Sequence, residues 1–529
     1  MNPCRDSRSA RFQHHLVTTL LAASLMAGTC EANARLPVGP VGNAALFDPV
    51  TVDADSDGFG SAVAAGDFDG DGIDDLAVVD QDHRSTVRIY LGQAWTVGAP
   101  FAIKFMPETA SVPLVAGASP GPNVVLAVGD FDHDNDDVEL AIGEPGDSFS
   151  TEGAGAVFVL DRASNGSWSV INTIRQGFED YPGVSEAGDH FGASLAVGRF
   201  DQNSLEDLAI GIPGETTTGE QNSGVVMVVY AGVAGLYPDD AEAFYRGFNG
   251  LTGVPHADEQ LGFALAAGDF DGDGADDLAV GIPGATCAGF VNAGSVMVLP
   301  GQLNPGGLDA AGVQYWSQAM ADIEDSCETN DRFGTALVAG DFSQTPIGEA
   351  DTADLAIGIP LESVDGVNGA GAVAVIYGSE NDGLTAQGNQ FLHEGLFPGG
   401  APEAALFGTR LGHARFGDHT FARDSLIIGA PLATRYGLSF AGAVWSVPPS
   451  NSRLAPEGAR QLTLTPAYLA GPAAEEDLFG AQMVAGDFNG DDATDLAIGV
   501  PGHDVNGADA AGAVQVLYQS DFIFVDSFD

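Results

Sequence analysis

Apolar residues in this chain gather in short runs of four to six, many of them β-branched, and each run is bounded by Gly, Pro or Asp. A Gly-rich turn leads into such a run at Gly155–Val159, Gly224–Val228, Gly371–Ile376 and Gly512–Leu517. Runs of this length between turn residues predict β-strands, because a helix needs an apolar face that recurs over a longer stretch. The pattern therefore predicts an all-β fold of many short strands.

One longer phrase also recurs along the chain. It consists of Phe-Gly, an apolar run, Gly-Asp-Phe, an acidic loop and then Asp-Leu-Ala-Ile-Gly, often followed by Pro. Two copies are degraded, since Gly129–Gly146 lacks its Phe-Gly and Phe407–Pro431 lacks the acidic loop. The clear copies are Phe59–Val79, Phe191–Gly214, Leu261–Gly284, Phe333–Pro360 and Phe479–Gly502.

The copies follow one another at a spacing of about 70 residues, with acidic loops that start at residues 67, 130, 199, 269, 341, 415 and 487. Each period holds about four short strands, which cannot bury both faces of a sheet alone, so the units are expected to pack side by side in a closed ring. The sequence therefore predicts a seven-bladed β-propeller over residues 35–519 that leaves no room for another domain.

A closed ring needs a fourth strand for its last blade, because the final period ends soon after Tyr518. The N-terminal segment around Phe47–Val52 is expected to supply it. The C-terminal Phe522–Val525, within residues 520–529, could fill the same place as an alternative closing strand.

The acidic loop of the first repeat has carboxylates at positions 1, 3, 5 and 9 and Gly at position 6. Alternate side chains that point inward would surround one point with oxygens, and the position 7 carbonyl would add another. Hard oxygen ligands in a flexible loop suit Ca²⁺, and a strand rather than a helix follows, which excludes an EF-hand. The expected ligands are Asp67, Asp69, Asp71, the Ile73 carbonyl and Asp75.

Three further loops have the same pattern or a close variant of it. The fourth is complete, the seventh has Asn at position 3, and the second has a one-residue insertion. A single loop of this kind could be an ordinary Asp-Gly turn, but recurrence in register predicts about four calcium sites. The expected ligands are Asp269, Asp271, Asp273, Ala275 and Asp277; Asp487, Asn489, Asp491, Ala493 and Asp495; and Asp130, Asp132, Asp134 and Glu139.

Two loops have Arg in place of the first Asp, Arg199 in the third repeat and Arg415 in the sixth. A planar guanidinium can satisfy several oxygens at once. We therefore predict that both arginines act as surrogate cations, Arg199 for Asp201 and Asp207, and Arg415 for Asp418 or Asp424. The alternative is that both are simply exposed. The fifth loop keeps Asp341 but is five residues longer, so its metal state is left open.

These phrases together resemble the FG-GAP repeat of integrin α subunits and related secreted proteins, over essentially the whole mature chain. The resemblance implies a propeller with calcium loops on its lower face and ligand-binding loops on its upper face. This chain shows no further integrin ectodomain in its sequence, so the resemblance implies extracellular binding or cell adhesion rather than two-subunit signalling.

The charge of the chain is strongly negative, with 74 acidic and 18 basic residues and a net charge of −56. A surface of this sign repels nucleic acids and anionic lipids, so neither is expected as a partner. Hydrophobic residues make up 45%, which is enough for a core and argues against global disorder.

The N-terminus has the features of a secretory signal peptide. A basic region precedes an apolar stretch, Leu16–Ala27, that is too short to span a bilayer. Cleavage is expected after Ala34, which makes residues 1–34 the signal and the protein secreted or displayed at the cell surface. Lipidation at Cys30 is the alternative. No later segment has the length of a transmembrane helix.

Cleavage would leave Cys287 and Cys327, which are expected to form a disulfide in an oxidising compartment. Both lie in connections opposite the acidic loops. Asp57, Asp189, Asp331 and Asp477 each stand two residues before a repeat Phe and are expected to cap turns.

The sequence contains no Gly-x-Ser-x-Gly or His-Glu-x-x-His, and its histidines recur at no common position. We therefore predict a non-enzymatic, calcium-stabilised binding or adhesion module that meets an extracellular protein or glycan. The alternatives are a propeller enzyme, a lyase or hydrolase acting on a polymer such as a polysaccharide, and a structural surface-layer component.

Overall fold

The computed structural model describes most of the repeat region. The described residues are 45–47, 58–80, 86–93, 106–113, 124–132, 138–146, 151–179, 181–201, 203–232, 235–303, 306–344, 350–416, 423–450, 452–462, 473–505 and 508–518. All of them fall in one compact unit, residues 39–529. The expected signal segment, residues 1–34, and the alternative closing strand Phe522–Val525 lie outside the described residues.

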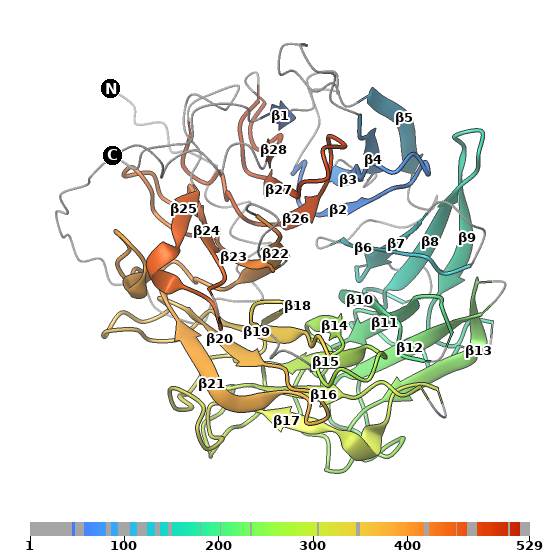
Figure 1. Cartoon of the computed structure of the whole chain (residues 1–529). Helices are drawn as coiled ribbons and strands as arrows, with labels where there is room; N and C mark the ends of the chain where they lie inside the picture. The colour runs from blue at the N-terminus through green and yellow to red at the C-terminus, as the bar shows by residue number, and fades with distance from the viewer. Residues whose placement is uncertain are drawn as a thin grey trace, which may run out of the picture. The chain divides into compact units, whose positions relative to one another are not determined.

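The strands form seven four-stranded antiparallel sheets, as predicted (Figure 1). We number the sheets as blades 1 to 7 in chain order of their innermost strands. Blade 1 has β2 (Val63–Gly66), β3 (Asp75–Asp80), β4 (Thr86–Leu91) and β5 (Met106–Pro113); blade 2 has β6 (Val125–Gly129), β7 (Glu139–Glu144), β8 (Ala156–Arg162) and β9 (Trp168–Ile174); blade 3 has β10 (Ser194–Gly198), β11 (Asp207–Ile212), β12 (Val225–Gly232) and β13 (Gly235–Phe244).

The later blades follow the same order. Blade 4 has β14 (Leu265–Gly268), β15 (Asp277–Ile282), β16 (Ser295–Leu299) and β17 (Gln314–Trp316); blade 5 has β18 (Ala336–Gly340), β19 (Asp354–Ile359), β20 (Ala372–Tyr377) and β21 (Thr385–Leu392); blade 6 has β22 (Arg410–Ala414), β23 (Ser425–Ala430), β24 (Ala443–Val447) and β25 (Arg460–Leu462). Blade 7 has β26 (Met483–Gly486), β27 (Asp495–Val500), β28 (Ala513–Leu517) and, as its outermost strand, β1 (Ala45–Phe47).

The blades form a closed ring. The innermost strand of each blade contacts that of the next, from β2 through β6, β10, β14, β18 and β22 to β26, and β26 contacts β2 again. Residues Ala45–Phe47 pair antiparallel with Val514–Val516, so the N-terminal part of the chain completes blade 7. The closing strand therefore comes from the predicted terminus but begins two residues earlier than expected.

Antiparallel strands define two faces of the ring. The lower face holds the acidic loops and the connections between the third and fourth strands. The upper face holds the connections between the second and third strands and those from one blade to the next. Helical elements in the described residues are three short 3-10 helices, η1 (Ala310–Gly312), η2 (Glu394–Leu396) and η3 (Pro456–Gly458), and none is long or apolar enough to cross a membrane.

The second strand of each blade is buried along its whole length, as in Asp207–Ile212 and Asp277–Ile282. Neighbouring blades cover both of its faces, which explains the continuous apolar run of the repeat instead of an alternating one. Phe side chains of the repeats add to this core: Phe191 and Phe200 of the third repeat, for example, are fully buried. Burial of one such ring contributes roughly 2–3 kcal/mol.

Cys287 and Cys327 form a disulfide in the structure, with Cα atoms 6.0 Å apart. Cys287 lies in the connection from β15 to β16 and Cys327 in the connection from β17 to β18, so both are on the upper face. They pack with Ala293 in a small buried cluster. The bond therefore ties the upper loop of blade 4 to the segment that leads into blade 5.

We predict that neither Cys287 nor Cys327 is a free thiol in the purified protein. Thiol labelling of the unfolded, unreduced chain should label neither Cys287 nor Cys327, while labelling after reduction should detect both. Two labelled cysteines without reduction would contradict the disulfide.

Candidate metal centres and the loops that carry them

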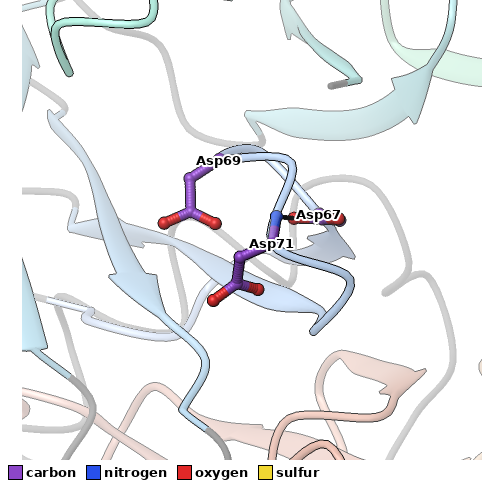
Figure 2. Close-up of side chains that lie close together, drawn as sticks. All are labelled: Asp67, Asp69 and Asp71. Carbon is purple, nitrogen blue, oxygen red and sulfur yellow. Dashed lines mark hydrogen bonds between the residues drawn. The ribbon is translucent and has the colours of Figure 1, made fainter. Parts of the chain in front are cut away.

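The predicted ligands Asp67, Asp69 and Asp71 come together on the loop between β2 and β3. Each offers a carboxylate oxygen, and the three oxygens lie within 4.8 Å of one another. Figure 2 shows these side chains on the loop, with the carboxylates of Asp69 and Asp71 beside each other. Asp269, Asp271 and Asp273 form the same group between β14 and β15. The structure thus brings positions 1, 3 and 5 together in blades 1 and 4.

The first Asp of each loop also holds the turn. Asp67 accepts hydrogen bonds from the N–H groups of Asp71 (3.0 Å) and Gly72 (2.7 Å). Asp269 does the same for Gly272, Asp273 and Gly274, and Asp487 for Gly490, Asp491 and Asp492. Position 6 has a left-handed backbone, with φ of 87° at Gly72 and 93° at Gly274, which favours Gly there.

The position 7 residues are held by the side chain at position 5. The N–H groups of Ile73, Ala275 and Ala493 donate to Asp71, Asp273 and Asp491 at 3.0, 2.8 and 3.0 Å. This orients the loop after the turn. The carbonyl groups of these three residues stay predicted ligands.

Position 3 carries an oxygen that the protein leaves unsatisfied. Asp69 Oδ1 is buried and has no hydrogen-bond partner among the described residues, and Asn489 Oδ1 in blade 7 is in the same condition. A buried acceptor without a donor is unfavourable by about 1–3 kcal/mol. Burial and the charge of Asp71 also raise the pKa of Asp69. An oxygen of this kind beside two more carboxylates fits a cation ligand.

Position 9 also has a structural role, and its role as a ligand stays a prediction. The carboxylate of Asp75 accepts from the N–H of Phe68 (3.0 Å) and from that of Gly92 (2.8 Å), at the end of the third strand. Both oxygens are therefore engaged with the backbone, and Asp75 is not in the close group of Asp67, Asp69 and Asp71. We call this two-bond arrangement the position 9 latch.

The latch recurs in blade 4, whose predicted ligand set is complete, and in blades 3 and 5, whose sets are not. Asp277 bonds Phe270 and Gly301 in blade 4, Asp207 bonds Phe200 and Ala231 in blade 3, and Asp354 bonds Phe342 and Gly378 in blade 5. Blades 2 and 7 keep related contacts, from Phe131 N–H to Glu139 and from Asn489 Nδ2 to Asp495. Because blades 3 and 5 have it too, the latch serves the fold whether or not a metal binds.

The remaining predicted ligands of blade 2 are only partly described. The N–H of Asp130 donates to Glu206 of blade 3 at 3.0 Å, while Asp134 lies outside the described residues. The site with Asp130, Asp132, Asp134 and Glu139 therefore stays a prediction.

The structure does not bring Arg199 into the role of a surrogate cation. Its side chain is exposed, and its backbone N–H donates to Asp276 at 2.8 Å. Asn203 occupies the loop instead: its amide nitrogen donates to Asp201 Oδ2 (3.0 Å) and to the Ala231 carbonyl (2.9 Å). Asp207 is satisfied by its latch. A neutral amide, and not a guanidinium, fills the loop of blade 3.

Arg415 does reach a predicted partner in blade 6. Its Nε lies 3.3 Å from Asp424, although the Arg415 side chain is 55% exposed. His413 is closer, with Nδ1 2.9 Å from the other oxygen. Burial alone would raise the pKa of Asp424, but the hydrogen bond and charge of His413 and the charge of Arg415 outweigh it and lower this pKa. Asp418 lies outside the described residues.

One recurring acidic residue was missed in the sequence. The residue at position 8 accepts a hydrogen bond from the first loop residue of the preceding blade and donates its own N–H back. Asp487 N–H meets Asp74 at 2.8 Å and Asp74 N–H meets the Asp487 carbonyl at 3.0 Å. The same exchange joins Glu206 to Asp130, Asp276 to Arg199 and Asp424 to Asp341. The signal was the acidic pair before the second strand, as in Asp74-Asp75 and Glu206-Asp207.

Comparison with known proteins supports the repeat. The model of the FG-GAP repeat matches residues 59–87, 261–299 and 479–517, which lie in blades 1, 4 and 7. The chain is 30% identical to integrin alpha-PS2 of Drosophila melanogaster over 227 residues, 42% of this chain and 14% of that protein. It therefore carries FG-GAP repeats on a seven-bladed propeller and is integrin-α-like in these repeats.

Other relatives share shorter or weaker segments. Human phosphatidylinositol-glycan-specific phospholipase D is 32% identical over 130 residues, 25% of this chain and 14% of that protein. Human integrin alpha-8 is 24% identical over 302 residues, 55% of this chain and 24% of that protein. The matched segments thus cover less than a quarter of the length of each of these relatives.

The latches predict a specific dependence of stability on pH. Burial raises the pKa of Asp207 and of Asp354 to about 7 each, above an unfolded value of about 3.9. The folded state then holds the proton more tightly, so this contribution to stability is complete below about pH 4 and is lost as pH rises through about 7. We expect the free energy of unfolding of the metal-depleted protein to fall between pH 5 and pH 8.

Urea denaturation of the variant Asp207→Asn tests this. The amide of this variant does not titrate. The free energy of unfolding should therefore fall less between pH 5 and pH 8, by on the order of 1–3 kcal/mol, since one pKa unit corresponds to about 1.4 kcal/mol. The control Asp239→Asn removes an exposed acid from β13 and should leave the slope unchanged. Equal slopes in the wild type and in Asp207→Asn would contradict the assignment.

Proposed function

We propose that this protein is a secreted, calcium-stabilised binding or adhesion module whose upper face meets an extracellular protein or glycan. The calcium part rests chiefly on Asp69 Oδ1, a buried oxygen without a partner among the described residues, beside Asp67 and Asp71. Asp269, Asp271 and Asp273 would hold a second ion, and Asp487, Asn489 and Asp491 a third. A bound Ca²⁺ would supply the positive charge that these grouped carboxylates lack.

Blade 2 would hold a fourth ion through Asp130, Asp132, Asp134 and Glu139. The position 9 residues would support the sites by holding the loop to the sheet. Their carboxylate oxygens already accept backbone hydrogen bonds, so they would bind the ion through their remaining lone pairs. Blade 3 is assigned no ion, because the Asn203 amide already satisfies Asp201.

The binding role is supported by where large apolar side chains are exposed. Among the described residues, eight of the twelve exposed large apolar side chains lie in upper-face connections: Val184, Phe248, Val254, Phe290, Val291, Met320, Leu396 and Tyr436. Exposed apolar and aromatic residues are typical of contact surfaces. The lower-face connections contribute Leu303 alone to this set.

A non-enzymatic role is supported by the surroundings of the histidines. His503 Nδ1 lies 3.0 Å from Asp477, and a His–Asp pair of this kind occurs in the Ser-His-Asp catalytic triad. The two side chains are only 2% and 0% exposed, so a substrate has no access to them. His190 bonds the Pro145 carbonyl through Nδ1, a structural contact.

Secretion is supported by the predicted signal segment, residues 1–34, and by the Cys287–Cys327 disulfide, since such bonds persist in oxidising compartments.

Calcium should stabilise the protein against heat. With affinities near the 10⁻⁴ M end of the extracellular range, 1 mM Ca²⁺ adds about 1.4 kcal/mol per site, so three or four sites raise Tm by a few degrees. The double variant Asp69→Asn, Asp271→Asn should lose much of this rise. The control Asp201→Asn changes position 3 of the loop in blade 3 and should keep it. An identical Tm in EDTA and in 1 mM Ca²⁺ would contradict the calcium assignment.

Binding to an array of glycans and extracellular-matrix proteins tests the upper face. We expect a ligand whose binding drops at least tenfold in the double variant Phe248→Ser, Val254→Ser and is unchanged in Leu303→Ser on the lower face. Binding that is lost only in the lower-face variant would overturn the assignment of the upper face.

A further inference from the structure

Two junctions on the upper face repeat one constellation of polar side chains. Between blades 2 and 3, Gln176 follows β9, Glu186 and Asp189 lie in the connection to β10, and Glu215 follows β11. Between blades 4 and 5, Gln318, Glu328, Asp331 and Glu362 take the corresponding places. Both sets lie on the side of the ring opposite the loops of Figure 2.

The acidic groups at the blade 4/5 junction are close together. Carboxylate oxygens of Glu328, Asp331 and Glu362 lie within 4.8 Å of one another, with Asp331 and Glu362 each 2% exposed. Asp325 adds a fourth carboxylate, since Gln318 Nε2 donates to it at 3.0 Å and to Glu362 at 2.8 Å.

The blade 2/3 junction repeats two of these contacts, although its carboxylates do not form a comparably close group. Gln176 Nε2 donates to Glu215 at 2.6 Å, and the Glu186 N–H donates to Asp189 at 2.6 Å. The matching bond from Glu328 N–H to Asp331 is present at the other junction. Position 183 here corresponds to Asp325 and is Gly, and a Cβ on it would lie 2.7 Å from Gln176 Nε2.

Each glutamine amide leaves one buried oxygen unsatisfied. Oε1 of Gln176 and of Gln318 has no hydrogen-bond partner in the described part of the chain, and the two residues are 6% and 3% exposed. The amides cannot be reversed, because each Nε2 already faces a carboxylate. Two acceptors of the same kind, at the same place in two repeats, call for a positively charged partner or a donor.

Neighbouring junctions meet this need with arginine. Arg246 binds Glu259 at 3.1 Å between blades 3 and 4, and Arg435 binds Glu394 and Glu403 near the blade 5/6 junction. At the two glutamine junctions the charges that act on the glutamate are acidic: those of Asp331 and Asp325 on Glu362, and those of Asp189 and Glu186 on Glu215. Burial, together with these charges, raises the pKa of Glu362 to about 8 and that of Glu215 to about 7.

We propose that each glutamine junction binds a hard divalent cation through the carboxylates of its Glu and Asp residues and the amide Oε1 of its Gln. An all-oxygen set with carboxylates and a neutral carbonyl is the donor set that Ca²⁺, Mn²⁺ and Mg²⁺ accept. Glu186 and Glu328 are exposed, which gives an ion a route from solvent to the buried groups. These sites are separate from the loop sites of the lower face.

The disulfide ties the blade 4/5 site in place. Cys327 directly precedes Glu328, and its bond to Cys287 holds the segment that carries Asp325, Glu328 and Asp331. The blade 2/3 site has no such bond. Loss of the disulfide should therefore weaken cation binding at the blade 4/5 site and leave binding at the blade 2/3 site unchanged.

Diffraction from crystals soaked in 1 mM Mn²⁺ tests the proposal directly. We expect anomalous peaks among Glu328, Asp331 and Glu362 and among Glu186, Asp189 and Glu215. Peaks in the loops of blades 1 and 4 report separately on the proposed calcium sites. Mn²⁺ in these loops with none at either junction would overturn the junction sites and leave the loop sites standing.

Titration calorimetry with Mn²⁺ provides the matched test in solution. Glu362→Gln and Glu215→Gln should each lose one bound Mn²⁺ per molecule, and Glu220→Gln, an exposed acid in the same connection as Glu215, should lose none. The double variant Cys287→Ser, Cys327→Ser should weaken one site about tenfold. An unchanged number of bound ions in both glutamine variants, with their folds intact by circular dichroism, would mean that the acidic groups share protons and would refute the proposal.

Discussion

The fold depends on backbone hydrogen bonds between blades that leave no space for a side chain. The N–H of Phe333 donates to the Ala293 carbonyl at 2.8 Å, and a Cβ on Gly294 would lie 2.2 Å from the Phe333 carbonyl oxygen. Gly294 also has a φ of 90°, which L side chains rarely adopt. The Phe-Gly of one repeat and the glycine of the preceding repeat are therefore two halves of one contact. This contact keeps the repeats in register and leaves insertions to the loops.

The acidic loops combine two separable roles at neighbouring positions. The latch at position 9 and the exchange at position 8 bind a loop to its own sheet and to the preceding blade, and blades 3 and 5 keep the latch without a complete ligand set. Positions 3 and 5 are then free to vary: Asn203 fills one loop with an amide, and Ser343 donates its hydroxyl to Asp354 in another. Loss of ligands therefore does not require loss of the blade.

Much of the architecture could be predicted from the sequence because the repeat carries it in local, regularly spaced residues. The ring, the number of blades and the grouping of Asp67, Asp69 and Asp71 follow from spacing alone. The two bonds of Asp75 could not be predicted, since the N–H of Gly92 approaches from a different strand. The charge of Arg199 predicts a role as a surrogate cation, but the short side chain of Asn203 reaches the carboxylate of Asp201 and the Arg199 side chain is exposed. The contacts of Gln176 and Gln318 could not be predicted either, because neither residue belongs to the recurring phrase of the repeat.

The charge balance of the chain limits how its upper-face junctions can neutralise buried carboxylates. With 74 acidic and 18 basic residues, few arginines are available to neutralise buried carboxylates. From the blade 2/3 junction to the blade 5/6 junction the two solutions alternate: Gln176 and Gln318 meet glutamates at the first and third of these, and Arg246 and Arg435 at the second and fourth. An amide can donate to a carboxylate but cannot cancel its charge. Each glutamine junction must therefore take a proton or an ion from the solvent. Its occupancy would then respond to the composition of the surrounding medium, whereas the arginine junctions would not.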